Sequence, residues 1–230
     1  MPDHRIHTEA DLDRGIAALV AVDPRFAALI AKAGRPPLRR RSDGFAGIAS
    51  TVVSQQLSTA SAGAIWGRLS AAFDPFEPAA IIRARKERLA RIGLSGPKIR
   101  ALKAIARAIA HGDLKLATLG DIDAEAAHAA LTAVHGIGPW TADIYLLASL
   151  GHADAWPAGD LALQEAARLA FGLKARPTAK EMMPLAESWR PWRAVAARVL
   201  WTYYRAVKGR EGAPVLPKKS IEQKGKKNGR

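Results

Sequence analysis

The stretch from Leu131 to Gln164 holds a glycine turn and, 24 residues after its first glycine, an isolated carboxylate. The turn, Gly136-Ile137-Gly138, stands between two helical patterns, and Asp160 stands where a further helix is expected to begin. Glycines allow positive φ and close approach of another backbone. A helix that starts after such a turn presents free N–H groups and the positive end of its dipole to a phosphate. We therefore interpret the turn as a phosphate clamp and the carboxylate as a candidate for chemistry on the clamped polymer.

Asp160 also fits a purely structural role, because an aspartate before an apolar helix is a common N-cap. The spacing permits more than a cap. A helix over residues 139–150 is ~18 Å long, and the nine residues 151–159 can extend ~30 Å. The chain can therefore bring Asp160 back to the side of the turn, and both roles stay open.

The composition favours a partner of negative charge. The chain has 230 residues, a formal net charge of +14 and no cysteine. Residues 208–230 hold eight basic and two acidic side chains, a net charge of +6, which leaves +8 for the rest. A basic globular part favours a nucleic-acid partner, although a basic surface also serves solubility. The absence of cysteine excludes disulfides, cysteine zinc sites and cysteine-ligated iron–sulfur clusters.

The N-terminal sequence MPDHRIHTEADLDR mixes both charge signs and lacks the apolar centre of a signal peptide. No apolar run approaches the ~18 residues that a membrane-spanning helix needs. We therefore expect a soluble, cytoplasmic protein that binds no membrane.

Apolar spacing and turn residues predict an all-α chain with short loops. The tail from Gly209 onward holds proline, glycine and lysine with almost nothing apolar, so we expect it to be disordered. The expected helices lie within 9–33 (two, divided at Asp23-Pro24), 45–69 (interrupted at Ser54-Gln55-Gln56), 79–111 (broken at Gly93 and at Ser95-Gly96-Pro97), 123–133, 139–150, 160–171, 178–188 and 191–207.

Four motifs together resemble one known superfamily. Val134-His135-Gly136-Ile137-Gly138-Pro139-Trp140-Thr141-Ala142 closely resembles the helix-hairpin-helix motif of DNA-repair proteins. The helix-hairpin-helix DNA glycosylases carry this hairpin in the same chain order with motifs resembling Ser54-Gln55-Gln56-Leu57-Ser58, Pro157-Ala158-Gly159-Asp160 and Trp189-Arg190-Pro191-Trp192-Arg193. The chain looks most similar to the alkylation-repair branch, the 3-methyladenine DNA glycosylase II type, over residues 10–207. We expect it to lack the extra N-terminal α/β domain that some of these enzymes carry.

The resemblance implies a two-lobed, all-α fold with the active-site cleft between the lobes. Residues 43–150 would form one helical domain, which contains the hairpin at 131–150. Residues 9–42 and 151–208 would form the second lobe, which carries Asp160. Residues 209–230 would be a disordered basic tail.

The resemblance also implies that Asp160 is the catalytic residue. Cleaving an N-glycosidic bond builds positive charge on the deoxyribose, which a fixed anion stabilises. The same carboxylate can orient or deprotonate the attacking water. Alkylated purines are already cationic leaving groups, so one carboxylate is enough.

Trp140 separates two types of enzyme. In the glycosylases that also cut the backbone, a lysine stands at the matching position and forms a Schiff base. Tryptophan cannot, so the resemblance implies hydrolysis without lyase chemistry. The indole face can stack on a cationic base, a contact worth ~0.5–2 kcal/mol. Trp201 is a second candidate for the base pocket or a core residue, and Tyr145 is a third candidate, next to the position where some relatives have tyrosine.

The DNA contacts implied by the resemblance lie in two segments. The hairpin would contribute Gly136, Ile137, Gly138 and Thr141. A base must leave the duplex before its sugar bond can be reached, and the wedge that fills its place would be one of Gln55, Gln56 and Leu57. Lys98, at a helix start within the basic run from Arg83 to Arg100, could contact a phosphate, which predicts strong salt sensitivity of binding.

The sequence therefore predicts a monofunctional DNA glycosylase that removes alkylated purines, chiefly 3-methyladenine and secondarily 7-methylguanine, from double-stranded DNA. We expect a monomer that needs no cofactor. The residues offer no side-chain metal cluster, while the resemblance admits a monovalent cation held by hairpin carbonyls. Two rivals stay open: a glycosylase for deaminated or oxidised bases, and a noncatalytic helix-hairpin-helix module that binds damaged DNA.

Overall fold

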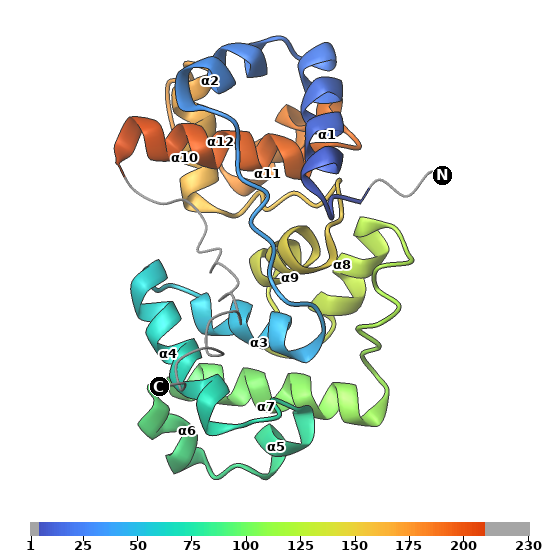
Figure 1. The fold of residues 1–230 in the computed structure, drawn as a ribbon, viewed down its shortest axis with the longest axis vertical. Helices are drawn as coiled ribbons and strands as arrows, with labels where there is room; N and C mark the ends of the chain where they lie inside the picture. The colour runs from blue at the N-terminus through green and yellow to red at the C-terminus, as the bar shows by residue number, and fades with distance from the viewer. Residues whose placement is uncertain (1–4, 210–230) are drawn as a thin grey trace, which may run out of the picture.

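The structure, a computed structural model, describes residues 5–209, and the regular elements in that range are all helical (Figure 1). An isolated bridge between Arg5 and His152 is the β-type pairing found there. The predicted all-α class is confirmed, whereas the predicted disordered tail lies outside the described residues except for Gly209. The helices are α1 (Glu9–Val22), α2 (Arg25–Ala33), α3 (Gly44–Ser54), α4 (Thr59–Ala72), α5 (Pro78–Arg83), α6 (Lys86–Ile92), α7 (Gly96–His111), α8 (Ala124–Thr132), α9 (Pro139–Tyr145), the π-helix η1 (Leu146–Leu150), α10 (Leu161–Ala170), α11 (Ala179–Leu185), the 3-10 helix η2 (Glu187–Trp189) and α12 (Arg193–Lys208).

The helices form two groups, one above the other in Figure 1. In the upper group α12 packs against α1, α2 and α10, and in the lower group α3 packs against α4, α7 and α9. Buried apolar side chains from both groups belong to one core cluster. Because the groups share a core, the chain folds as one body with two lobes. None of the helices among residues 5–209 is both long and apolar enough to cross a membrane.

The helices α8 and α10 begin at aspartate caps, which agrees with the helix expected over residues 123–133 and with the N-cap role considered for Asp160. The Asp123 carboxylate accepts hydrogen bonds from the N–H groups of Glu125 (3.0 Å) and Ala126 (2.9 Å). These bonds satisfy donors that the first turn of a helix leaves unpaired. The cap fixes the direction of α8, which is the incoming helix of the hairpin.

The outgoing helix of the hairpin differs from the uniform helix expected over residues 139–150. It is α-helical over α9 and then widens into the π-helix η1, all five residues of which are buried. Gly151 ends it in the left-handed region, with φ of 74°. The π-helix is rare and is found mostly as short segments within α-helices, frequently at functional sites. Here it ends where the segment 151–159, which leads to Asp160, begins.

A buried arginine joins the two groups of helices. The Arg198 guanidinium, on α12, donates to the carbonyls of Leu38, in the connection from α2 to α3, and of Leu147 (3.1 Å), in η1. Burial lowers the pKa of Arg198 to about 10, so it stays charged at neutral pH. These contacts hold the second lobe against the outgoing helix of the hairpin.

Candidate active site

Asp160 is buried, 6% exposed, and three N–H donors hold its carboxylate. Oδ1 accepts from the backbone N–H of Leu163 (2.8 Å) and from Nε1 of Trp201 (3.1 Å), and Oδ2 accepts from Nε1 of Trp140 (2.9 Å). Within residues 5–209 no lysine, arginine or histidine forms an ion pair with it. Asp160 is therefore the N-cap of α10, but the cap accounts for only one of these three bonds. The two bonds from the indoles lie outside the capping role.

The structure brings together three of the residues that the sequence singles out: Asp160, Trp140 and Trp201. Trp140 comes from the first turn of α9 and is half-buried, while Trp201 comes from the middle of α12 and is 9% exposed. Both indoles point their N–H groups at the carboxylate, a role that sequence reasoning missed because it considered only their ring faces. Stacking of a base on either ring stays a prediction.

Tyr145 does not belong to this group, and its predicted place in the base pocket is wrong. The side chain is 0% exposed, and burial raises the pKa of its phenol. Five residues separate it from Trp140 on α9, and at 3.6 residues per turn it faces the opposite side of the helix. It therefore packs in the core.

The backbone of the hairpin lies close to a neighbouring helix, as its glycines suggest. Gly136 has φ of 92°, and a Cβ on it would lie 2.4 Å from the Cβ of Ala101 on α7. Ile137 is 4% exposed and plugs the turn into the core. Gly138 is the N-cap of α9 with φ of −84°, and nothing lies within 4 Å of the place where its Cβ would be. The turn is therefore rigid on its inner side and open on its outer side.

The side chain of Thr141 lies inside the fold, so the DNA contact expected of this residue stays a prediction for its backbone N–H in the first turn of α9. It is 1% exposed, and its Oγ1 accepts a hydrogen bond from Nε2 of Gln55 (2.7 Å). Trp140 and Thr141 are neighbours in the first turn of α9, and one binds Asp160 while the other binds Gln55. The first turn of α9 thus links the carboxylate to the predicted wedge segment.

The wedge segment is a tight turn between α3 and α4. Gln55 is half-buried, Leu57 is half-buried, and Gln56 is exposed at φ of 54°. A non-glycine residue in this left-handed region is strained by about 1–3 kcal/mol, and such strain clusters at functional sites. The geometry presents Gln56 outward more than its two neighbours.

Lys98 is half-buried and binds the end of this turn, while the phosphate contact expected of it stays a prediction. Its Nζ donates to the carbonyls of Val53 (2.8 Å) and Gln55 (2.9 Å) at the end of α3, and burial lowers its pKa. A cation at a helix C-terminus satisfies carbonyls that have no partner in the helix. Lys98 therefore positions the turn.

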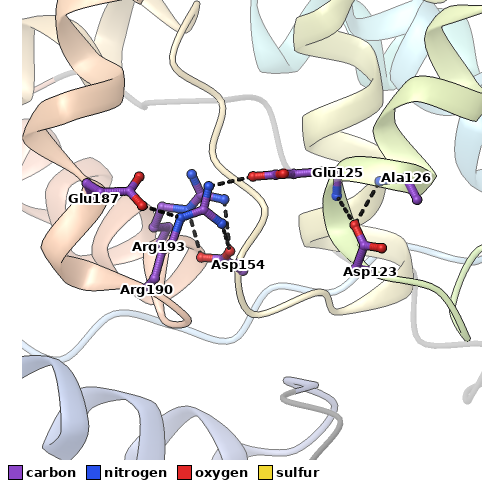
Figure 2. Close-up of polar contacts among 7 residues, drawn as sticks. All are labelled: Asp123, Glu125, Ala126, Asp154, Glu187, Arg190 and Arg193. Atoms are coloured by element: carbon purple, nitrogen blue, oxygen red, sulfur yellow. Dashed lines mark hydrogen bonds and ion pairs between the residues drawn. The ribbon is translucent and has the colours of Figure 1, made fainter. Parts of the chain in front are cut away.

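Sequence reasoning also missed a network of ion pairs centred on Arg190 (Figure 2). Arg190 and Arg193 both bind Asp154, which lies in the segment leading to Asp160. The Trp-Arg-Pro-Trp-Arg motif pointed to these arginines, but nothing in the sequence named Asp154 as their partner. Trp189 in the same motif is 1% exposed and donates to Asp23 (3.0 Å), so its role is structural.

The structure also holds a cavity of about 810 Å³, and none of the site residues lines it. Its walls include Arg5, Arg40, Phe45 and Leu116. Phe45 is at the start of α3, whereas the wedge segment follows its end, so the cavity lies at the other end of that helix. Among residues 5–209 no group of three or more His, Asp or Glu side chains is arranged to hold a metal ion.

The fold is helical, and its glycine turn starts a helix next to a buried carboxylate that two tryptophans hold. These features define a helix-hairpin-helix protein with a candidate enzyme site. The comparisons agree: residues 49–191 match the model of the HhH-GPD superfamily of base excision DNA repair proteins. The chain belongs to this superfamily.

Two relatives illustrate the likeness. A Mycobacterium tuberculosis protein named as a probable bifunctional transcriptional activator/DNA repair enzyme AlkA is 34% identical over 203 residues, 84% of this chain. The chain spans only 40% of the length of that relative. The DNA-3-methyladenine glycosylase 1 of Schizosaccharomyces pombe is 31% identical over 172 residues, which cover 73% of this chain and 75% of that protein.

Solved structures show the same fold. The Schizosaccharomyces pombe 3-methyladenine DNA glycosylase Mag1, solved in complex with abasic DNA, superposes with a TM-score of 0.75 at 27% identity, covering 85% of this chain and 97% of that chain. A DNA-3-methyladenine glycosidase of Bacillus halodurans gives a TM-score of 0.74 at 29% identity, covering 85% and 91%.

Proposed function

We propose that this chain is a DNA glycosylase that hydrolyses the N-glycosidic bond of alkylated purines in double-stranded DNA, 3-methyladenine first among them. The observation that carries the proposal is the Asp160 carboxylate, buried, held by three N–H donors and paired with no cation of the described residues. The names of two relatives, which refer to 3-methyladenine DNA glycosylases, support the choice of substrate.

The proposed reaction uses water as the nucleophile. The bond between C1′ and the purine nitrogen breaks, and its electron pair neutralises the positive charge of the alkylated base. Positive charge builds on the deoxyribose ring, where the fixed Asp160 carboxylate stabilises it. The water oxygen adds to C1′, and its proton passes to Asp160 and on to solvent.

The absence of a lyase step is part of the proposal and rests on Trp140. An indole has no amine to form a Schiff base with C1′, and here its N–H is already bonded to Asp160. Borohydride, which reduces a Schiff base to a stable amine, should trap no covalent complex with damaged DNA. A trapped complex would mean that another amine attacks the sugar.

The binding of DNA by this site would use the hairpin and the wedge segment together. The outer side of Gly138 is open, so a phosphate can approach the N–H groups at the start of α9. Of the three wedge candidates we propose Gln56, because it is exposed while Gln55 is bound to Thr141 and Leu57 is half-buried. A monomeric state and a cytoplasmic location also remain proposals.

Two alternatives stay distinguishable by experiment. A noncatalytic damage-binding module needs no carboxylate held by two indoles beside the hairpin, so the geometry favours the enzyme. A glycosylase for deaminated or oxidised bases would use a similar carboxylate. The bases that the protein releases decide between the two enzymes.

The decisive experiment is incubation with methylated duplex DNA and chromatographic identification of the released bases, for the wild type and for Asp160→Asn. Asparagine keeps the N-cap acceptor for Leu163 but removes the negative charge. We expect 3-methyladenine from the wild type, and from the variant a release rate about 10²–10³-fold lower, as when a preorganised transition-state contact is lost. Binding of undamaged duplex should persist. Equal rates for the two proteins would contradict the mechanism, and release of other bases alone would contradict the substrate.

A further inference from the structure

Arg190 contacts three carboxylates at once (Figure 2). Its guanidinium lies 2.5 Å from Oε1 of Glu125, 2.5 Å from Oδ2 of Asp154 and 2.9 Å from Oε1 of Glu187. A planar guanidinium with five donors can serve several acceptors in fixed directions, which a lysine cannot. The side chain is one-third exposed, so the cluster lies near the surface rather than in the core.

The three carboxylates come from different parts of the fold. Glu187 lies in η2, three residues before Arg190 and in the same lobe. Asp154 lies in the segment that leads to Asp160. Glu125 lies in the first turn of α8, the incoming helix of the hairpin, where the Asp123 cap fixes its direction. The contact to Glu125 is therefore the one that crosses from the second lobe to the hairpin.

Asp154 is anchored more firmly than an exposed ion pair would be. Arg193, whose side chain is 4% exposed, binds it with two hydrogen bonds of 2.7 and 2.8 Å. Beside it, the N–H of Ala194 donates to the carbonyl of Ala153 (2.8 Å). The start of α12 therefore holds the segment before Asp160 by both side chain and backbone.

The same helix holds Asp160 itself. Trp201, eight residues after Arg193 on α12, donates to Asp160, and eight residues span about 12 Å of helix. The segment that carries the carboxylate is thus bound near both of its ends to a single helix, α12. The position of this segment relative to the rest of the second lobe is therefore fixed. The variable that remains is the distance of the hairpin from Asp160.

Besides the buried contact of Arg198 with Leu147 in η1, two side-chain contacts set that variable. One is the direct bond from Trp140 to Asp160. The other is the chain of contacts from Glu125 through Arg190 to Asp154. We propose that Arg190 is a positioning residue, which holds the hairpin at the distance from Asp160 that base release requires by binding Glu125 and Asp154 together. This inference rests on the proposed glycosylase function.

The energetics separate this role from ordinary stabilisation. Glu125 is 70% exposed, and ion pairs of that exposure add little to the stability of the fold. Catalysis is more sensitive, because a misplacement of about 1 Å between reacting groups can slow a reaction by about 10²-fold. Loss of the contact should therefore appear in the rate of the chemical step and not in the melting temperature.

The chain provides a matched control. Glu187 is 64% exposed and binds the same guanidinium, but its contact stays within one lobe. Glu125→Ala and Glu187→Ala each remove one carboxylate from Arg190 and change the net charge equally. Only the first removes the link to the hairpin. Arg190 itself is left unchanged, since its loss would also disturb Asp154.

The test measures base release in single turnovers at saturating protein, together with the affinity for duplex and the melting temperature. We expect Glu125→Ala to release base about tenfold more slowly with affinity and melting temperature near those of the wild type, and Glu187→Ala to keep the wild-type rate. Equal rates in both variants, whether lowered or not, would overturn the proposal. So would a fall in melting temperature large enough to explain the lost rate. Failure of the wild type to release any alkylated base would instead overturn the proposed function.

Discussion

Replacing Trp140 with phenylalanine separates the two roles that this side chain can have. Phenylalanine keeps an aromatic face for stacking but has no N–H to donate to Oδ2 of Asp160, a bond of 2.9 Å in the structure. A hydrogen bond to a charged group contributes about 1.5–3 kcal/mol. About 1.4 kcal/mol corresponds to a factor of ten in rate. If the bond strengthens by the full amount of about 1.5–3 kcal/mol between the bound substrate and the transition state, its loss should slow release of an alkylated base by about 10–150-fold.

Trp201→Phe is the control, because it removes a donor from the other oxygen. Oδ1 keeps the backbone N–H of Leu163 when Trp201 is lost, so we expect a smaller loss, worth about 0.5–1.5 kcal/mol. The assay is single-turnover release of base from methylated duplex, with binding measured separately. A Trp140→Phe rate within twofold of the wild type would refute the reasoning and leave only the ring face as the function of Trp140.

Two further predictions concern the fold around the site. Gly136→Ala should lower the free energy of unfolding by about 2–5 kcal/mol, the sum of left-handed strain and overpacking against α7, whereas Gly138→Ala, at φ of −84° with open space around it, should change it by less than about 1 kcal/mol; urea unfolding of both variants checks this, and equal losses would contradict it. Burial raises the pKa of Asp143 on α9 to about 8 from its ordinary 3.8. The folded protein therefore keeps a proton that the unfolded chain loses, so this residue lowers stability as pH rises from about 4 to 8. Asp143→Asn should raise the free energy of unfolding more at pH 8 than at pH 5, and the reverse order would show that the contact of Asp143 with His128 at 3.6 Å dominates.

The sequence predicted well those features that depend on local chemistry. Glycine and proline punctuation placed the hairpin, and aspartate before an apolar helix placed the starts of α8 and α10. Each of these depends on residues within one or two turns of each other, so the local pattern carries the information.

The contacts that the sequence did not reveal depend on what a helix packs against. Lys98 and Thr141 are polar residues at helix starts, where exposure to a phosphate is reasonable. In the fold Lys98 donates to the carbonyls of Val53 and Gln55 at the end of α3, and the hydroxyl of Thr141 accepts from Gln55. Tyr145 is adjacent in sequence to the position where some relatives have tyrosine, but it lies on the side of its helix opposite Trp140. The Arg190 cluster joins residues 65 positions apart, and no local spacing reveals such a pairing.

The N–H groups that hold Asp160 are all neutral, and this has a consequence for what the site retains. A carboxylate without a neighbouring cation attracts a positively charged ring, whereas a neutral ring gains no comparable electrostatic stabilisation from it. In the proposed reaction the purine is neutral once the glycosidic bond breaks, so the attraction that favours a cationic lesion would no longer hold the product. The tightest small ligand of this site should accordingly be a sugar mimic with a protonated ring nitrogen, because it keeps its charge where the transition state has it only briefly.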